Sequence, residues 1–178
     1  MMKKVFLSLV FIAAVLSIVV ALQPDEFHVV RSTAIKADAA AVFAHVNNLK
    51  RWEAWSPWAK LDPDAKSSYA GPIEGTGAAM TWSGNNQIGE GTMTITESRP
   101  NELIRFRLDF VRPFASTSIA EFTFKPEGAG TQVVWSMQGK NNFIGKAIGL
   151  IIDCDKMVGE QFEKGLLQLG LITEGRVG

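Results

Sequence analysis

Few side chains of this sequence combine the residue types and the spacing that catalysis requires. The candidate acids are Glu90, Asp153 and Asp155, and a catalytic carboxyl group needs water-poor surroundings that tune its pKa. Glu90 lies between two glycines at an expected turn or strand start, and both aspartates fall on the polar side of an expected helix. All three are therefore expected to face solvent, and the sequence assigns no catalytic residue.

The residues that could bind a metal or act as a nucleophile are also few. Cys154 is the single cysteine, so no internal disulfide and no thiolate zinc cluster can form. His28 and His45 lie far apart with no cysteine partner nearby, which is a poor pattern for zinc. G-x-S-x-G, H-E-x-x-H and glycine-rich phosphate-loop motifs are absent from the sequence. We predict no metal, no cofactor and an inert, buried thiol at Cys154.

Aromatic residues form the most distinctive local pattern. Trp52, Trp55 and Trp58 follow one another at intervals of three residues, with Ser56-Pro57 between the last two. One interpretation is an aromatic gate at the mouth of a cavity, or an anchor among lipid headgroups, where tryptophan is favoured. The other is a packed plug beneath short helices, since large aromatic residues are mostly buried. The sequence leaves both interpretations open.

The overall composition excludes two classes of protein. The chain has 18 basic and 18 acidic residues, so it lacks the basic excess that phosphate binding requires, and we expect no nucleic-acid partner. An apolar fraction of 47% with zero net charge is equally unlike a disordered chain. The length fits one domain with a short extension, and a core of ordinary size needs no covalent cross-links.

An apolar segment precedes the domain. Residues 5–22 carry no charge, follow Lys3 and Lys4, and are long enough to cross a bilayer as a helix. An uncleaved anchor, with the domain on the outer side of a cytoplasmic membrane, competes with a cleaved signal peptide and a secreted domain. The expected organisation is an anchor or signal segment at 1–22, a linker at 23–26, the domain at 27–173 and a tail at 174–178.

Hydrophobic periodicity predicts one antiparallel sheet. Two short helices, at 39–47 and 49–55, are expected after the first strand, with Asp38 as the N-cap of the first. The connections between the later strands are too short for crossover helices. One face of the sheet is apolar and the other polar. The expected strands are 27–36, 66–70, 78–82, 91–98, 103–110, 116–125 and 131–138.

A single long amphipathic helix is expected over residues 143–172, covering the apolar face of the sheet. Its inward arc includes Leu150, Ile151 and Met157. Gly165 and Gln161 also project inward, which is unusual for a plain core because a glycine inside a helix costs about 1 kcal/mol relative to alanine. The arrangement therefore predicts a cavity between the helix and the sheet.

The order of elements and several sequence words resemble the SRPBCC superfamily, which includes START, Bet v 1 and polyketide cyclase-like proteins, and most of all its membrane-anchored bacterial members. The resemblance covers residues 27–172. It implies an α+β helix-grip fold, a curved sheet of about seven strands wrapped on a long C-terminal helix, with an apolar cavity between them. It implies no reaction, since one fold hosts many functions. The sequence segments on which the resemblance rests are RWEAWSPW at 51–58, LDP at 61–63, TWSGN at 81–85, GEG at 89–91, TESRP at 96–100 and GEQFEKGL at 159–166.

Three hypotheses follow for function. The first is non-catalytic binding of a small hydrophobic molecule, lipid-like or polyketide-like, in a domain tethered to a membrane. The second is a cyclase, dehydratase or hydrolase acting in the same cavity, and the third is a structural domain with a filled cavity. The sequence says nothing of oligomeric state. The expected ligand-binding residues are Trp55, Trp82, Met93, Phe106, Phe110, Phe122, Trp135, Met157, Gln161, Phe162 and Gly165.

Overall fold

Alternating apolar and polar residues place seven strands in one antiparallel sheet in the computed structural model, which describes residues 2–176. The sheet order is β1-β7-β6-β5-β4-β3-β2, so every neighbouring pair except β1 and β7 is joined directly along the chain. This arrangement confirms the predicted helix-grip fold. The strands are β1 Glu26–Ile35, β2 Lys66–Ala70, β3 Ala79–Ser83, β4 Glu90–Arg99, β5 Leu103–Arg112, β6 Ser116–Glu127 and β7 Gly130–Lys140.

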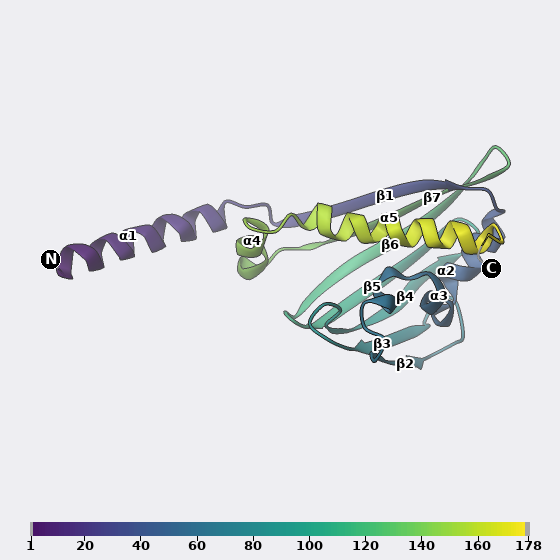
Figure 1. Ribbon diagram of the computed structural model, residues 1–178, viewed down its shortest axis with the longest axis horizontal. Coiled ribbons are helices and arrows are strands. Elements are labelled where there is room, and N and C mark those ends of the chain that lie inside the picture. The colour runs from purple at the N-terminus through teal and green to yellow at the C-terminus, as the bar shows by residue number, and fades with distance from the viewer. Residues whose placement is uncertain (1, 177–178) are drawn as a thin grey trace.

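Helices cover one face of this sheet, which we call the inner face. Figure 1 shows the long C-terminal helix lying along β1 and β7, with the short helices beside its C-terminal half. Alternation along β6 buries Phe122 and Phe124 on the inner face, while Glu121 and Thr123 lie on the outer face. The helical segments after β1 are α2 Ala39–Asn47, η1 Leu49–Arg51, α3 Trp52–Trp55 and η2 Pro57–Lys60.

The C-terminal segment consists of two helices, and the expectation of one continuous helix is wrong. They are α4 Phe143–Gly149 and α5 Cys154–Thr173. Asp153 ends the interruption as the N-cap of α5, because its carboxylate accepts a hydrogen bond from the backbone N–H of Lys156 at 3.0 Å. The break rotates the first part of the segment away from the sheet, so Leu150 and Ile151, expected inside, are exposed.

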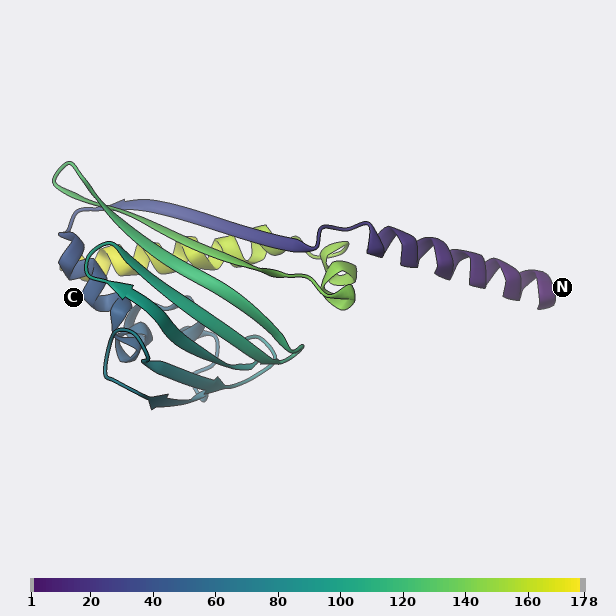
Figure 2. The same cartoon turned by 180° about the vertical axis from the view of Figure 1, so that it is seen from behind.

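The N-terminal helix α1, Met2–Ala21, extends away from the domain, as both views show (Figures 1 and 2). Its apolar side chains are exposed except that of Val20, and the helix is long and apolar enough to cross a membrane. Its C-terminal end lies beside α4, where the Lys146 ammonium group donates a hydrogen bond to the carbonyl oxygen of Ala21 at 3.3 Å. A helix with such a surface is typical of a membrane anchor or of a signal sequence.

Candidate ligand-binding site

Aromatic rings fill the part of the inner face that lies toward α2 and α3. Trp135 and Phe162 are stacked with centroids 4.0 Å apart, and Phe122 lies 4.6 Å from Trp135. All three are almost fully buried. These distances leave no room for a guest between the rings, so the prediction that these residues enclose a cavity is wrong for this region. This ring cluster comprises Trp52, Trp55, Trp58, Phe106, Phe122, Trp135 and Phe162.

The first two tryptophans of the sequence pattern are the plug of this cluster. Their centroids are 4.5 Å apart, and both rings are buried. The Trp52 indole donates to the carbonyl oxygen of Val46 at 2.8 Å, and the Trp55 indole donates to that of His45 at 3.3 Å. These bonds satisfy the polar edge of each ring and fix α3 against α2. Trp58 is half-buried on the edge of Trp135.

Gly165 brings α5 close to the ring cluster. A Cβ atom at this position would lie 2.8 Å from Cζ3 of Trp135 and 3.1 Å from Cδ of Pro57. Both neighbours belong to rigid rings, so neither can move aside easily. Gly165 could have served either the approach of a ligand or a close contact of the helix with the sheet, and these distances favour the close contact, with the sheet and with η2.

Toward α4 the inner face is covered incompletely. The Trp82 ring lies across the position where Gly91 lacks a side chain, and its indole donates to the carbonyl oxygen of Ile88 at 3.0 Å. Phe110 packs on Trp82 with centroids 5.7 Å apart. These side chains are half-buried although they continue the apolar rows of the core. This half-covered region comprises Met80 and Trp82 on β3 and Leu108 and Phe110 on β5, which share rows across β4.

The remaining predicted site residues fall in different places. Met93 is buried on β4 next to the half-covered region. Gln161 is half-buried on α5. Met157 is 52% exposed, because α5 packs on the sheet through the row that contains Phe162 and Leu169 and Met157 lies off this row, so its predicted place in the interior is wrong. Of the predicted set, only Trp82 and Phe110 lie in the half-covered region.

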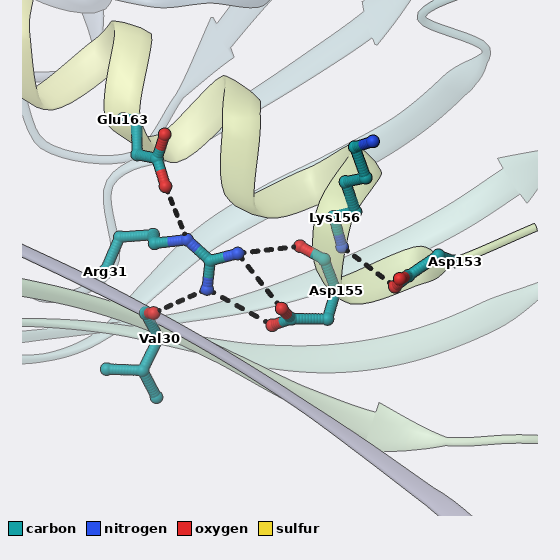
Figure 3. Close-up of polar contacts among 6 residues, drawn as sticks. All are labelled: Val30, Arg31, Asp153, Asp155, Lys156 and Glu163. Atoms are coloured by element: carbon teal, nitrogen blue, oxygen red, sulfur yellow. Dashed lines mark hydrogen bonds and ion pairs between the residues drawn. The ribbon is translucent and has the colours of Figure 1, made fainter.

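The sequence did not predict the role of one charged residue beneath α5. Arg31 lies on the inner face of β1, and its guanidinium donates to Oε1 of Glu163 at 2.8 Å and to Oδ2 of Asp155 at 3.0 Å (Figure 3). Gly159 lies between these two acids, and a Cβ atom there would be 2.0 Å from Nη2 of Arg31. Arg31 therefore holds the N-terminal half of α5 against β1. The sequence offered one sign of this role: Arg31 shares the apolar face of the strand with Val29, and a charged residue on such a face needs a partner.

The candidate acids all have structural partners. Glu90 pairs with Arg112 at 3.0 Å, Asp153 caps α5, and Asp155 binds Arg31. The hydrogen bonds from Arg31 hold the pKa of the Asp155 carboxyl below its ordinary value, which is opposite to the shift that a general acid at neutral pH needs. Within residues 2–176, no three His, Cys, Asp or Glu side chains gather in a group that could hold a metal.

Two hollows lie outside the predicted site. One, of about 280 Å³, opens on the outer face where β1, β7 and β6 meet, beside His28, Ile119 and Gln138. The other, of about 80 Å³, lies at the sheet edge between β1 and the C-terminal half of α5. Neither includes a residue of the ring cluster or of the half-covered region.

Comparison with known proteins agrees with this architecture. A family model described as polyketide cyclase/dehydrase and lipid transport matches residues 26–169. The Aha1 dimer from Colwellia psychrerythraea is similar in structure, with a TM-score of 0.61 and 14% identity over 85% of this chain and 99% of that chain. Protein CV1439 from Chromobacterium violaceum is similar with a TM-score of 0.59 and 15% identity, over 85% of this chain and 98% of that chain. Ara h 8.0201 is similar with a TM-score of 0.59 and 10% identity, over 84% of this chain and 99% of that chain. Such identities show the fold alone. No curated protein matches the chain.

Proposed function

Because this chain belongs to the polyketide cyclase/dehydrase and lipid transport family, we propose that its domain binds a small hydrophobic molecule without transforming it. The ligand lies against the half-covered region and not within the ring cluster. The class of ligand is lipid-like or polyketide-like, and its binding is driven by the burial of apolar surface at about 25 cal/mol per Å².

One observation carries this proposal: the apolar rows of the inner face continue toward α4 after their cover of short helices ends. Trp82, Leu108 and Phe110 stay half-buried there, and Phe110 packs on Trp82. Half-exposed apolar side chains gathered on a concave face are typical of ligand sites. The three candidate acids, Glu90, Asp153 and Asp155, lie in structural ion pairs or a helix cap, which supports binding in preference to catalysis.

The proposal includes a tether. We propose that α1 is retained and crosses the cytoplasmic membrane once, with Lys3 and Lys4 on the inner side and the domain on the outer side. The partners are then a small hydrophobic ligand and the lipid bilayer itself. A domain held at the membrane surface lies next to a source of apolar molecules.

Native mass spectrometry of the full chain, released from a mild detergent, tests the site. We expect an added mass from a co-purifying apolar molecule. Phe110→Gln should reduce its occupancy roughly tenfold, because losing a buried phenyl ring removes about 1.5–3 kcal/mol of apolar transfer free energy.

Val111→Gln is the matched control, since Val111 is the next residue of β5 and its side chain is exposed on the opposite face. It should leave the occupancy unchanged. Equal losses in both variants would remove Phe110 from the site. Protein that is always empty would favour a structural domain with a filled core.

A further inference from the structure

The short helix α4 exposes two large apolar side chains and covers its charged side chain. Phe143 and Ile144 are exposed, whereas the side chain of Lys146 is only 12% exposed. A helix packed on a soluble domain normally shows the reverse arrangement. The inversion indicates that the outer side of α4 faces something other than water.

The turn after α4 extends this surface. Leu150, Ile151 and Ile152 are all exposed, and Ile151 is 89% exposed. Monomeric soluble domains rarely expose several large apolar residues in one continuous patch without a partner. We call this surface the α4 patch; it consists of Phe143, Ile144, Leu150, Ile151 and Ile152.

The location of α4 identifies the partner. Lys146 donates to the carbonyl oxygen of Ala21 at 3.3 Å and forms an ion pair with Asp25, which lowers the pKa of that carboxyl. These contacts fix α4 at the level where the apolar helix α1 ends (Figure 2). If α1 spans a bilayer, this level is the interface between the acyl chains and the headgroups.

The opposite end of the sheet is different. Turns there carry Asp38, Glu102 and Glu127, all of which are exposed. Ile73 is also exposed at that end, but as a single apolar side chain, whereas five large apolar residues lie together in the α4 patch, at the end from which α1 emerges. This placement is expected for a surface continuous with a membrane anchor.

We propose that the α4 patch lies in the interfacial layer of a lipid bilayer and forms a second membrane contact beside α1. This inference rests on the proposed retention of α1. The contact turns the end of the sheet that carries Trp82 and Phe110 toward the membrane, because the start of β4 and the end of β5 lie at the same end as the start of β1 and the end of β7. Ligand would then enter from the bilayer.

The experiment uses the full chain in vesicles of phosphatidylcholine and phosphatidylglycerol. Ile151→Cys, in a Cys154→Ser background, carries the environment-sensitive fluorophore NBD, and lipids with a nitroxide on the upper acyl chain act as quenchers. Ile73→Cys is the matched control, because Ile73 is a 74% exposed isoleucine at the far end of the sheet. The label at position 151 should show blue-shifted emission and be quenched roughly threefold more than the label at position 73.

Three outcomes would overturn the proposal. Equal, weak quenching at both positions would show that the α4 patch stays in water. A blue shift at position 151 that depends on protein density, without quenching by the lipids, would assign the patch to a second copy of the chain. The intact mass of the membrane-extracted protein shows whether α1 is retained, so it distinguishes failure of the membrane contact from failure of the proposed tether. Loss of residues 1–22 overturns both, whereas a full mass with an unquenched label overturns the membrane contact alone.

Discussion

Toward α2 and α3 the inner face of the sheet is filled by rings in contact with one another, whereas toward α4 the same face is half covered. Both parts are built from the same alternating strands: Phe106 is fully buried on β5, and Phe110, four residues later on the same face, is only half-buried. The difference lies in the cover. The short helices insert Trp52 and Trp55 over the first part, where both rings contact Phe122, whereas Phe110 in the second part packs on Trp82 of β3.

This contrast shows where a helix-grip domain of this kind can hold a guest. Sheet alternation determines which side chains face inward, but the elements between β1 and β2 determine how much of the inner face is occupied. In this chain they fill the deep part, so the binding surface moves to the end beside α4. The two parts therefore respond differently to mutation, the filled part in stability and the half-covered part in ligand binding.

The largest expected effect is the loss of a ring from the filled part. Phe162→Ala should lower the free energy of unfolding by about 3–5 kcal/mol, because it leaves a cavity against Trp135. Met157→Ala, on the same helix, should change it by less than about 0.5 kcal/mol, since Met157 is exposed. Urea unfolding followed by tryptophan fluorescence measures both. Similar losses would mean that Met157 is covered in solution and that the boundary between the two parts is misplaced.

A pair of glycines on α5 gives a smaller and more specific effect. Gly165→Ala should destabilise the protein by about 1–3 kcal/mol, because its methyl group would clash with Trp135 and Pro57. Gly170→Ala should be neutral or stabilise by up to about 1 kcal/mol, since its nearest neighbour is Cγ1 of Ile35 at 3.6 Å and alanine favours the helix. Thermal unfolding compares the two. If Gly165→Ala is tolerated as well as Gly170→Ala, there is space beside Trp135. The ring cluster would then enclose a cavity, as the sequence predicted.

Much of the fold could be predicted from the sequence, because turn residues and alternation with a period of two mark strand limits locally. The strand β2, for example, has the predicted bounds at 66–70. The break before α5 was missed because it depends on one capping side chain, Asp153, within a continuous helical pattern. The predicted inward arc of residues 143–172 also included Met157, because it was drawn over both helices together, whereas the buried row of α5 alone excludes this residue.

The candidate site was harder to predict than the fold. The sequence identified which rings face inward, but whether rings enclose a space or fill it depends on distances between segments far apart in the chain, such as Trp55 and Phe122. Arg31 was missed for a related reason. Its partners Asp155 and Glu163 look solvated on their own helix, and only the crossing of α5 over β1 brings them to the guanidinium.

The smallest expected effect is a pH dependence of stability in the filled part. His45 lies on α2, its Nδ1 atom is buried, and no hydrogen-bond partner for that atom lies within residues 2–176. Burial, and secondly the charge of Arg51, lower the pKa of His45 below its ordinary value of 6.5. As the pH falls below 6.5, His45 is protonated in the unfolded chain but stays neutral in the folded protein. The free energy of unfolding is therefore highest above this pH and decreases as the pH falls toward the lowered pKa. Carboxylates with lowered pKa values, such as Asp109, act only at more acidic pH.

Urea unfolding at pH 7.5 and pH 5.5 measures this decline, and His45→Gln should abolish most of it. His28→Gln is the control, because His28 is exposed on β1 at the other end of the sheet and its replacement should preserve the wild-type difference between the two pH values. If His28→Gln removes the difference and His45→Gln does not, the imidazole of His45 is solvated. The α2 side of the filled part would then be more open to water than its packing indicates.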